Sequence, residues 1–398
     1  MKIVHFFDRV QLERGGTIRA ALDMCRVMAD RGHDVTLATF DDTDVPTEWR
    51  DGSASVGPKW PNVKVISSPS LPGGFYPPGG PTCAKAPLAG ADVTHLHGIW
   101  RPSTAQFGAR AKDAGVPIVV SCHGMLDDWS MRQGTAKKKL YLNFMGQGLF
   151  DAVSVFHATA DDERRQASNW VPESKIEVVP YITDLTPFDS LPGPEMARDK
   201  FSLGDGTGPF TVLFLSRLHY KKQPDVLIKA VALMRERGED VRVLFAGTGD
   251  DPYVAQLKSL AKSSGLTDET CRFLGMVTGD LKHSVYEAAD VFALPTSQEN
   301  FGLVYTESLA CETPIVATTG TDIWRELDAT GGATIADGTP EGFAEALSAL
   351  AKRREELPEV GRRGRANVYK WLEPNAIAER FEKMYERARG GVPAGVAS

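Results

Sequence analysis

The sequence predicts an α/β protein of two domains, each built around a doubly wound parallel sheet. Apolar strand-like runs alternate with helical patterns along the chain, which indicates parallel strands joined by crossover helices. A chain of 398 residues is too long for one ordinary core and suits two domains of roughly 150 to 200 residues each. Residues 185–209 are polar, rich in Pro and Gly and without periodicity, so we expect the interdomain linker there.

The first domain, residues 1–184, carries short apolar runs that we expect to be strands, with helices between them. After the first strand, Gly15 and Gly16 precede a helix that Gly32 ends. Residues 67–87 are dense in Pro and Gly and predict a long loop. The expected strands are 3–7, 35–39, 63–66, 93–96, 118–121, 153–156 and 176–179.

The second domain, residues 210–372, repeats this alternation of strands and helices. Residues 373–389 have the pattern of a charged amphipathic helix, and 390–398 that of a mobile tail. Its clearest expected strands are 211–215, 243–246, 273–277 and 291–294.

Composition excludes several classes of protein. A net charge of -7 argues against nucleic acid as the main partner, because phosphate backbones need a basic face. The five cysteines are odd in number, scattered and without paired metal spacing, which fits a reducing cytoplasm. The N-terminus meets charge too early for a signal peptide, and no run approaches the ~18 apolar residues of a spanning helix. We therefore expect a cytoplasmic protein, either soluble or peripheral at the inner face of the membrane.

The most informative motif is the segment 297–307, in which two carboxylates flank a glycine where a helix begins. An apolar strand precedes it, so we expect Glu299 on the loop and Glu307 on the helix. The backbone amides around Gly302 are expected to be free at the helix start, where a diphosphate binds favourably. Because carboxylates accept hydrogen bonds from sugar hydroxyls, the motif suits a sugar-nucleotide site. Taken alone, the segment equally fits an ordinary helix start with an acidic first turn, and the second motif below favours the sugar-nucleotide site.

Two cations leave the end of another predicted strand. Arg217 and Lys222 follow the strand 211–215, and Pro224 suits the first turn of the next helix. Both side chains are therefore expected in the loop at the carboxyl edge of the sheet, where doubly wound folds bind ligands.

In order and spacing, these two segments resemble the C-terminal half of the retaining glycosyltransferases of the GT-B fold, family 4. The resemblance covers nearly the whole chain and is strongest from residue 216 to 307. It implies two Rossmann-like domains facing a cleft, the N-terminal one binding the acceptor and the C-terminal one the nucleotide sugar. It also implies that the helix 373–389 crosses back to the N-terminal domain.

The resemblance implies a role for each motif residue. Glu299 contacts the donor sugar, Glu307 contacts the nucleotide ribose, and Arg217 and Lys222 hold the diphosphate. Glycine loops and a strand end beside the base complete the implied donor site. Its residues are Gly15, Gly16, Arg217, Lys222, Gly247, Gly249, Met276, Val277, Glu299, Asn300, Phe301, Gly302, Leu303 and Glu307.

Two histidines, His97 and His123, each end a predicted strand. For His97 we favour a structural role. His123 matches the family position beside the anomeric centre of the donor sugar, which implies sugar orientation and transition-state stabilisation and not nucleophilic attack. The implied catalytic residues are therefore His123, Arg217, Lys222 and Glu299.

The resemblance implies a retaining, metal-independent transfer of a hexose or related sugar from a nucleoside diphosphate sugar, with no cofactor. The implied acceptor is a hydroxyl of a saccharide or a lipid-linked molecule, in cell-envelope polysaccharide or glycolipid biosynthesis. Two alternatives stay open. One is a GT-B nucleotide-sugar epimerase or hydrolase, and the other is a non-catalytic sugar-nucleotide-binding protein.

Two further patterns are less favoured. The triplet Asp42-Thr43-Asp44 has the D-x-D form that holds metal in glycosyltransferases of the other large fold, but acidic runs are usually solvated loops. The glycine pair lacks the G-x-G-x-x-G spacing of a dinucleotide site, which disfavours an NAD-dependent enzyme, although Asp41 suits a ribose.

Residues 129–145 mix bases with large apolar groups. Such a stretch either docks on an anionic leaflet or packs its apolar stripe inward as a solvated helix, and the sequence favours neither. Three positions depart from the family pattern. Residues 179–184 occupy the place where Pro-Asn-Gly is usual, Glu312 replaces a usual glycine, and 320–322 replace a common glycine pair near the donor sugar.

Overall fold

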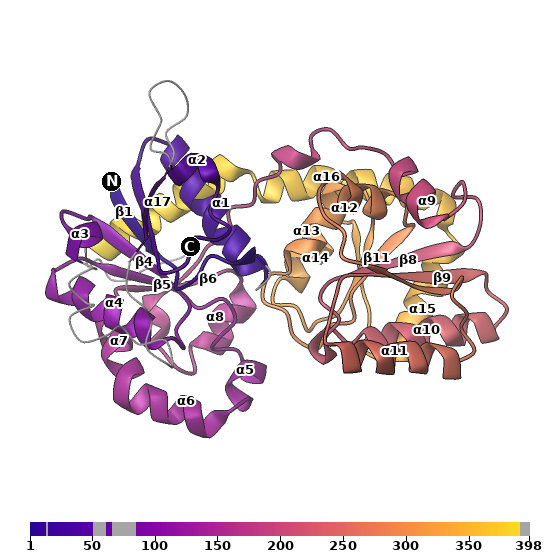
Figure 1. The fold of residues 1–398 in the computed structure, drawn as a ribbon, viewed down its shortest axis with the longest axis horizontal. Coiled ribbons are helices and arrows are strands. Elements are labelled where there is room, and N and C mark those ends of the chain that lie inside the picture. Colours follow the sequence, from indigo (N-terminus) through magenta and orange to yellow (C-terminus); the bar gives the residue numbers. More distant parts are fainter. Residues whose placement is uncertain (13–14, 51–60, 66–84, 391–398) are drawn as a thin grey trace. The chain divides into compact units, whose positions relative to one another are not determined.

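The computed structural model describes residues 1–12, 15–50, 61–65 and 85–390, which form two compact units (Figure 1). The first unit combines Met1–Asp184 with the chain from Leu372 onward, and the second is Leu185–Trp371. Most of the loop predicted at 67–87 and nearly all of the tail 390–398 lie outside the described residues. In the described part of the chain, no helix is long and apolar enough to cross a membrane.

The described part of the first unit holds one seven-stranded parallel sheet in the order β3-β2-β1-β4-β5-β6-β7. This is the doubly wound order, which reverses between the neighbours β1 and β4. Each predicted strand of this half is present. The strands are β1 (Lys2–Phe6), β2 (Asp34–Thr39), β3 (Asn62–Val65), β4 (Val93–His97), β5 (Ile118–Ser121), β6 (Val155–Ala158) and β7 (Ile176–Val178).

One strand of the first unit is shifted from its predicted place, and in the second unit the strand predicted at 273–277 is found two residues earlier, as β10 (Cys271–Gly275). The apolar run at 153–156 predicts a strand, but β6 begins at Val155, because Val153 still donates its N–H to Leu149 at the end of a helix (3.0 Å). A continuous apolar run does not show where a helix ends and a strand begins.

Helices cover both faces of the first sheet, as crossover connections require. The C-terminal helix α17 belongs to this unit, as the resemblance implied, and contacts α1, β4, β5 and β6. The helices are α1 (Gly16–Asp30), α2 (Thr47–Arg50), α3 (Lys85–Leu88), α4 (Pro102–Asp113), α5 (Asp128–Arg132), α6 (Thr135–Tyr141), the π-helix η3 (Leu142–Gly146), α7 (Gln147–Ala152), α8 (Asp161–Ala167), η4 (Glu173–Lys175) and α17 (Pro374–Gly390).

A buried stripe on α17 explains why this helix returns to the first unit. Ile377, Phe381 and Tyr385 recur at helical spacing and are buried in one core cluster with α1 and the sheet. Arg31 at the end of α1 also forms a two-pronged ion pair with Glu382, at 2.8 and 2.9 Å.

In the described chain of the second unit, six parallel strands follow the order β10-β9-β8-β11-β12-β13, which again reverses between neighbours, here β8 and β11. The strands are β8 (Phe210–Leu215), β9 (Val241–Ala246), β10 (Cys271–Gly275), β11 (Val291–Ala293), β12 (Ile315–Ala317) and β13 (Ala333–Ile335).

Figure 1 shows α10, α11 and α15 on one face of this second sheet and α12 and α13 on the other. The helices are η5 (Thr186–Phe188), α9 (Glu195–Phe201), η6 (Tyr220–Lys222), α10 (Pro224–Glu236), α11 (Asp251–Ser263), α12 (Gly279–Glu287), α13 (Leu303–Ala310), α14 (Trp324–Ala329), α15 (Pro340–Ala351), η7 (Arg354–Glu356) and α16 (Leu357–Trp371).

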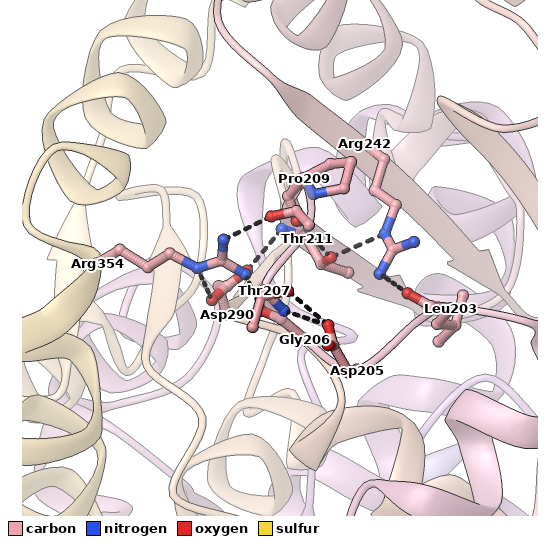
Figure 2. A network of polar contacts seen from close by, with 10 residues as sticks. Leu203, Asp205, Gly206, Thr207, Pro209, Thr211, Arg242, Asp290 and Arg354 are labelled. Carbon is pink, nitrogen blue, oxygen red and sulfur yellow. Dashed lines mark hydrogen bonds and ion pairs between the residues drawn. The ribbon is translucent and has the colours of Figure 1, made fainter.

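The segment 185–209, which lacks periodicity and is expected as a linker, groups with the second unit and carries η5 and α9. Arg354 donates to the carbonyls of Gly206 (2.8 Å) and Gly208 (2.6 Å) and pairs with Asp290 at 2.7 Å (Figure 2). A guanidinium thus satisfies the carbonyl groups of an irregular segment, which hydrophobic periodicity cannot reveal.

Candidate active site

Three expected donor residues of the second unit, Arg217, Lys222 and Glu299, lie at the point where its strand order reverses. β8 and β11 are neighbours, with Val212 opposite Val291. The loop after β8 carries Arg217 and Lys222, and the loop after β11 carries Glu299. Ligands of doubly wound folds bind outside the carboxyl ends of the strands at such a reversal.

The two loops are joined through a backbone carbonyl. Lys221 accepts hydrogen bonds from the amide and hydroxyl of Ser297 and from the hydroxyl of Thr296, each at 3.1 Å. Gln223 follows in the left-handed conformation (φ 51°) and lets Pro224 start α10. This geometry fixes the position from which Lys222 reaches the second loop.

Lys222 and Glu299 form an ion pair, with only 12% and 18% of their side chains exposed. Burial, and then the positive charges of Lys221 and Arg217, lower the pKa of Lys222 to about 7. The Glu299 carboxylate acts in the opposite direction, because it stabilises the ammonium form. The site therefore contains a poorly solvated cation, and a second anion nearby would stabilise its charge.

Arg217 is exposed, and its side chain makes no hydrogen bond or ion pair with any other residue that the structure describes. Its loop is held by Gly247 and Gly249. A Cβ at Gly247 would lie 2.0 Å from the carbonyl oxygen of Ser216, and one at Gly249 would lie 2.2 Å from that of Leu218. These glycines thus allow the loop after β9 to pack against the Arg217 loop.

A glycine also shapes the start of α13. Gly302 has a φ of 64°, and a Cβ there would lie 2.9 Å from Cγ of Glu299. The amides of a first helical turn lie at the positive end of the helix dipole, and in α13 that of Tyr305 donates to the carbonyl of Gly302 at 2.9 Å. The side chain of Asn300 donates to Asp322 (3.1 Å), and Phe301 is buried against Trp371. Both side chains are thus held by neighbours within the second unit.

Glu307 lies on α13, as predicted, and already has two partners. Its carboxylate accepts hydrogen bonds from Lys282 at 2.8 Å and from the hydroxyl of Tyr286 at 3.4 Å. Both partners come from α12, where their spacing of one helical turn places them on one face. At the end of β10, Met276 is 63% exposed while Val277 is buried. Met276 therefore offers an apolar surface at the sheet edge.

In the first unit, Gly15 and Gly16 begin α1. Gly15 has a φ of 125°, and a Cβ built on it would meet nothing within 4 Å. The glycine is thus required by its backbone conformation and leaves open space beside the helix start. The neighbouring residues 13–14 lie outside the described part of the chain.

His123 follows β5 with a φ of 52°, and its imidazole is engaged at both nitrogens. Nδ1 lies 2.5 Å from the hydroxyl of Tyr181, and Nε2 lies 3.1 Å from Nδ1 of His97. The buried carboxylate of Glu163 accepts a hydrogen bond from the next amide, Gly124, at 2.7 Å. Burial lowers the pKa of His123 to about 3, so the ring is neutral at physiological pH.

Comparison with known proteins identifies the family of this chain. The family model for glycosyl transferases group 1 matches residues 195–367, and that for a glycosyl transferase 4-like domain matches 15–181. The chain is 31% identical over 320 residues to the D-inositol 3-phosphate glycosyltransferase of Kineococcus radiotolerans, covering 75% of this chain and 72% of that protein. The chain belongs to the group 1 glycosyltransferases.

Solved structures agree on the fold of this glycosyltransferase. Anabaena HepE in complex with UDP superposes with a TM-score of 0.77 at 16% identity, covering 97% of this chain and all of HepE. The complex of HepE with UDP-glucose gives a TM-score of 0.75 at 16% identity, covering 97% and 99% of the two chains. The two units therefore have the GT-B fold.

The acidic run 41–44 of this glycosyltransferase supports its own loop. Asp41 accepts hydrogen bonds from the amide and hydroxyl of Thr43, at 3.0 and 2.5 Å. Asp44 accepts one from the amide of Leu12 at 2.7 Å. These contacts are those of a turn that carboxylates stabilise.

Sequence reasoning did not predict several partners of the candidate site. Lys282 and Tyr286 have a sequence signal, since they are one turn apart on a helix just before the motif. The carbonyl of Lys221 and the carboxylate of Glu163 have no sequence signal, because the residues that they bind are distant in the chain. His97, expected to be structural, is the direct neighbour of His123.

Proposed function

We propose that this glycosyltransferase takes its sugar from a nucleoside diphosphate sugar and transfers it, with retention and without a metal ion, to a hydroxyl acceptor. The observation that carries the proposal is the pairing of Lys222 with Glu299 where the strand order reverses, beside Arg217 and the start of α13. Cations, helix amides and carboxylates together match the phosphates and hydroxyls of such a donor.

The leaving diphosphate explains the cations. Its departure leaves positive charge on the anomeric carbon and negative charge on the phosphate oxygens. Arg217 offers a planar guanidinium that can bind two phosphate oxygens. Lys222 supplies a compact ammonium charge, and its ion pair with Glu299 holds that charge in place. Fixed donors of this kind stabilise the leaving group without reorganisation during the reaction. We therefore assign charge neutralisation to Arg217, Lys222 and the amides of α13.

The carboxylates explain the selection of the sugar nucleotide. Glu299 is assigned to the hydroxyls of the sugar, and Glu307 to the ribose hydroxyls, with Lys282 holding its carboxylate in place. The resemblance assigns His123 to orientation of the sugar and to stabilisation of the transition state. A neutral imidazole suits this role, since a cation would oppose the positive charge that develops on the sugar.

We further propose a lipid-linked or saccharide acceptor of the cell envelope, met at the cytoplasmic face of the membrane through α6 and η3. Figure 1 shows α6 at the edge of the first unit. Leu140 is 61% exposed and Phe144 80% exposed, beside exposed Lys137 and Lys139. Apolar side chains next to bases suit the headgroup region of an anionic leaflet.

The test begins with a thermal-shift screen of UDP-, GDP- and ADP-sugars, with UDP-glucose first because HepE binds it. The bound donor is then offered with acceptors, including inositol phosphates because of the named relatives. Transfer with the donor's anomeric configuration in the NMR spectrum supports the proposal. Stoichiometric nucleotide release from donor alone indicates a hydrolase or epimerase. Binding without turnover on any acceptor indicates a binding protein.

A further inference from the structure

The first unit contains two chains of hydrogen-bonded side chains in the interior of its sheet. All five histidines involved are buried. The first chain runs through His5, His97, His123 and Tyr181, with successive distances of 3.0, 3.1 and 2.5 Å. The second runs through Tyr385, His95, Ser121, His157 and the carbonyl of Val179, with distances of 2.9, 2.7, 2.6 and 2.7 Å.

The direction of the second chain follows from its last member. The carbonyl of Val179 can only accept, so Nε2 of His157 carries the proton. Nδ1 of His157 then accepts from Ser121, whose oxygen accepts from Nε2 of His95. Nδ1 of His95 accepts from Tyr385. Both histidines of this chain are therefore protonated on Nε2.

The first chain constrains its three histidines together. Burial lowers the pKa of His5 to about 3 and that of His97 well below its usual value, so both are neutral like His123. A neutral imidazole has one N–H and one lone pair. Each ring that accepts a hydrogen bond at one nitrogen must therefore donate one from the other, so all the hydrogen bonds of this chain point in the same direction. Either all three are protonated on Nδ1 and donate toward Tyr181, or all three are protonated on Nε2 and donate toward His5.

The ring geometry supports this chain. The planes of His5 and His97 differ by 17°, and those of His97 and His123 by 13°. The ring centroids lie 5.4 and 5.3 Å apart while the bonded nitrogens lie 3.0 and 3.1 Å apart, so neighbouring rings lie end to end and each N–H points along the lone pair that it meets. His5, His95 and His97 also bring ligand atoms within 4.8 Å, as a metal site would. However, hydrogen bonds within the described residues already use every nitrogen of these rings except Nε2 of His5.

We propose that His97, backed by His5, is a positioning residue that holds His123 in one neutral tautomer and one ring plane. The second chain contains a matched control in His95, which lies on the same strand, is buried equally and packs against His97 with ring centroids 4.6 Å apart. His95 has no hydrogen bond to His123. The effect of His97 on turnover rests on the proposed function, whereas its effect on the tautomer does not.

The direct test is 15N NMR of the full chain labelled in histidine. We expect one tautomer for each buried ring, with the same nitrogen protonated in His5, His97 and His123. Tyr181→Phe should change the 15N shifts of His97 and His5, which the hydroxyl does not contact, and leave His95 and His157 unchanged. Different nitrogens protonated within the first chain, or changes confined to His123, would overturn the proposal.

Variants link the tautomer to the reaction. We expect His97→Leu to mix the tautomers of His123 and lower kcat on the order of 100-fold, as a misplaced group does, with unchanged UDP affinity. His95→Leu should alter neither the tautomer of His123 nor kcat. His97→Asn, whose amide can restore the bond to His123, should recover most of kcat. Equal losses in His97→Leu and His95→Leu would overturn the proposal. Coupled tautomers without any sugar transfer would instead reject the proposed function alone.

Discussion

Lys222 and Glu299 form an ion pair that joins the turn η6 to the loop before α13. The pair is mostly buried, so removal of either partner leaves the other charge unbalanced in a poorly solvated place. The pair also places a cation and a hydroxyl-binding carboxylate side by side. In the proposed donor complex, a phosphate that meets Lys222 therefore brings the attached sugar close to Glu299.

The fixed cations should replace a metal. We expect Arg217→Ala and Lys222→Ala each to lower kcat about 100-fold, close to the loss of one preorganised oxyanion donor. Lys229→Ala, which removes a lysine from the exposed side of α10, should be silent. Initial rates should survive titration with EDTA. Loss of activity in EDTA with rescue by manganese would show that carboxylates such as Asp42 and Asp44 hold a required metal.

The two glutamates should separate binding from turnover. We expect Glu307→Ala to weaken donor binding, because the ribose contact is lost and Lys282 loses its partner. Glu299→Ala should mainly lower kcat, because the sugar is misplaced. Isothermal titration with the donor and steady-state kinetics of both variants measure this. An equal fall of affinity and turnover in both would contradict the division of roles.

His123 should matter for turnover and not for folding. We expect His123→Ala to keep the circular dichroism spectrum and lower kcat on the order of 100-fold or more. The NMR spectrum of the product should show the anomeric configuration of the donor. An inverted product, or a fully active variant, would reject the assignment.

The free energy of unfolding should fall as the pH drops below about 6.5, the ordinary pKa of histidine in an unfolded chain. Burial lowers the pKa of His5 and His123 to about 3 and that of His157 to about 4, so the folded state stays neutral while the unfolded chain binds protons. The contribution of each neutral buried histidine to the free energy of unfolding is complete above its pKa in the unfolded chain. This contribution is lost as the pH falls toward its lower pKa in the folded protein. Each such histidine contributes up to about 1.4 kcal/mol per pH unit.

Calorimetry between pH 8 and 5.5 checks this, since carboxylates such as Glu382, with its pKa lowered to about 2, still stay ionised there. His95→Leu should show a shallower dependence, because one buried histidine is gone. The charges facing His157 are Arg380 and Glu177, which act on its pKa in opposite directions. A transition temperature independent of pH in this window would contradict the neutral histidine chains.

The surface of α6 and η3 should bind anionic vesicles. We expect the double variant Leu140→Ser, Phe144→Ser to lose most of its binding to phosphatidylglycerol vesicles in a sedimentation assay, because both side chains are exposed apolar anchors. Met196→Ser, at an exposed apolar residue of the second unit (45% exposed), should bind normally. Equal binding of both variants, or of wild type to neutral vesicles, would argue against this surface.

Local patterns were sufficient for much of the fold. The strands β1 and β8 are short apolar runs, and the stripe of Phe381 and Tyr385 has helical period, so each could be predicted from neighbouring residues. Arg217, Lys222, Glu299 and Glu307 could also be placed, because strand ends of a doubly wound sheet meet at one edge. The conformation of loops could not be predicted in this way. The segment 185–209 has no period, and only contacts such as those of Arg354 show how it folds.

By itself the sequence determined the alternation of strands and helices, the two units and the positions of the donor motif, since these follow from spacing along the chain. Only the tertiary structure decided that Lys222 pairs with Glu299 and that His123 lies in a hydrogen-bonded chain that runs from His5 to Tyr181. These partners lie on different strands or loops, and parallel pairing brings them together after long crossovers. A hydrogen bond depends on distance and direction between two atoms, and local periodicity carries neither.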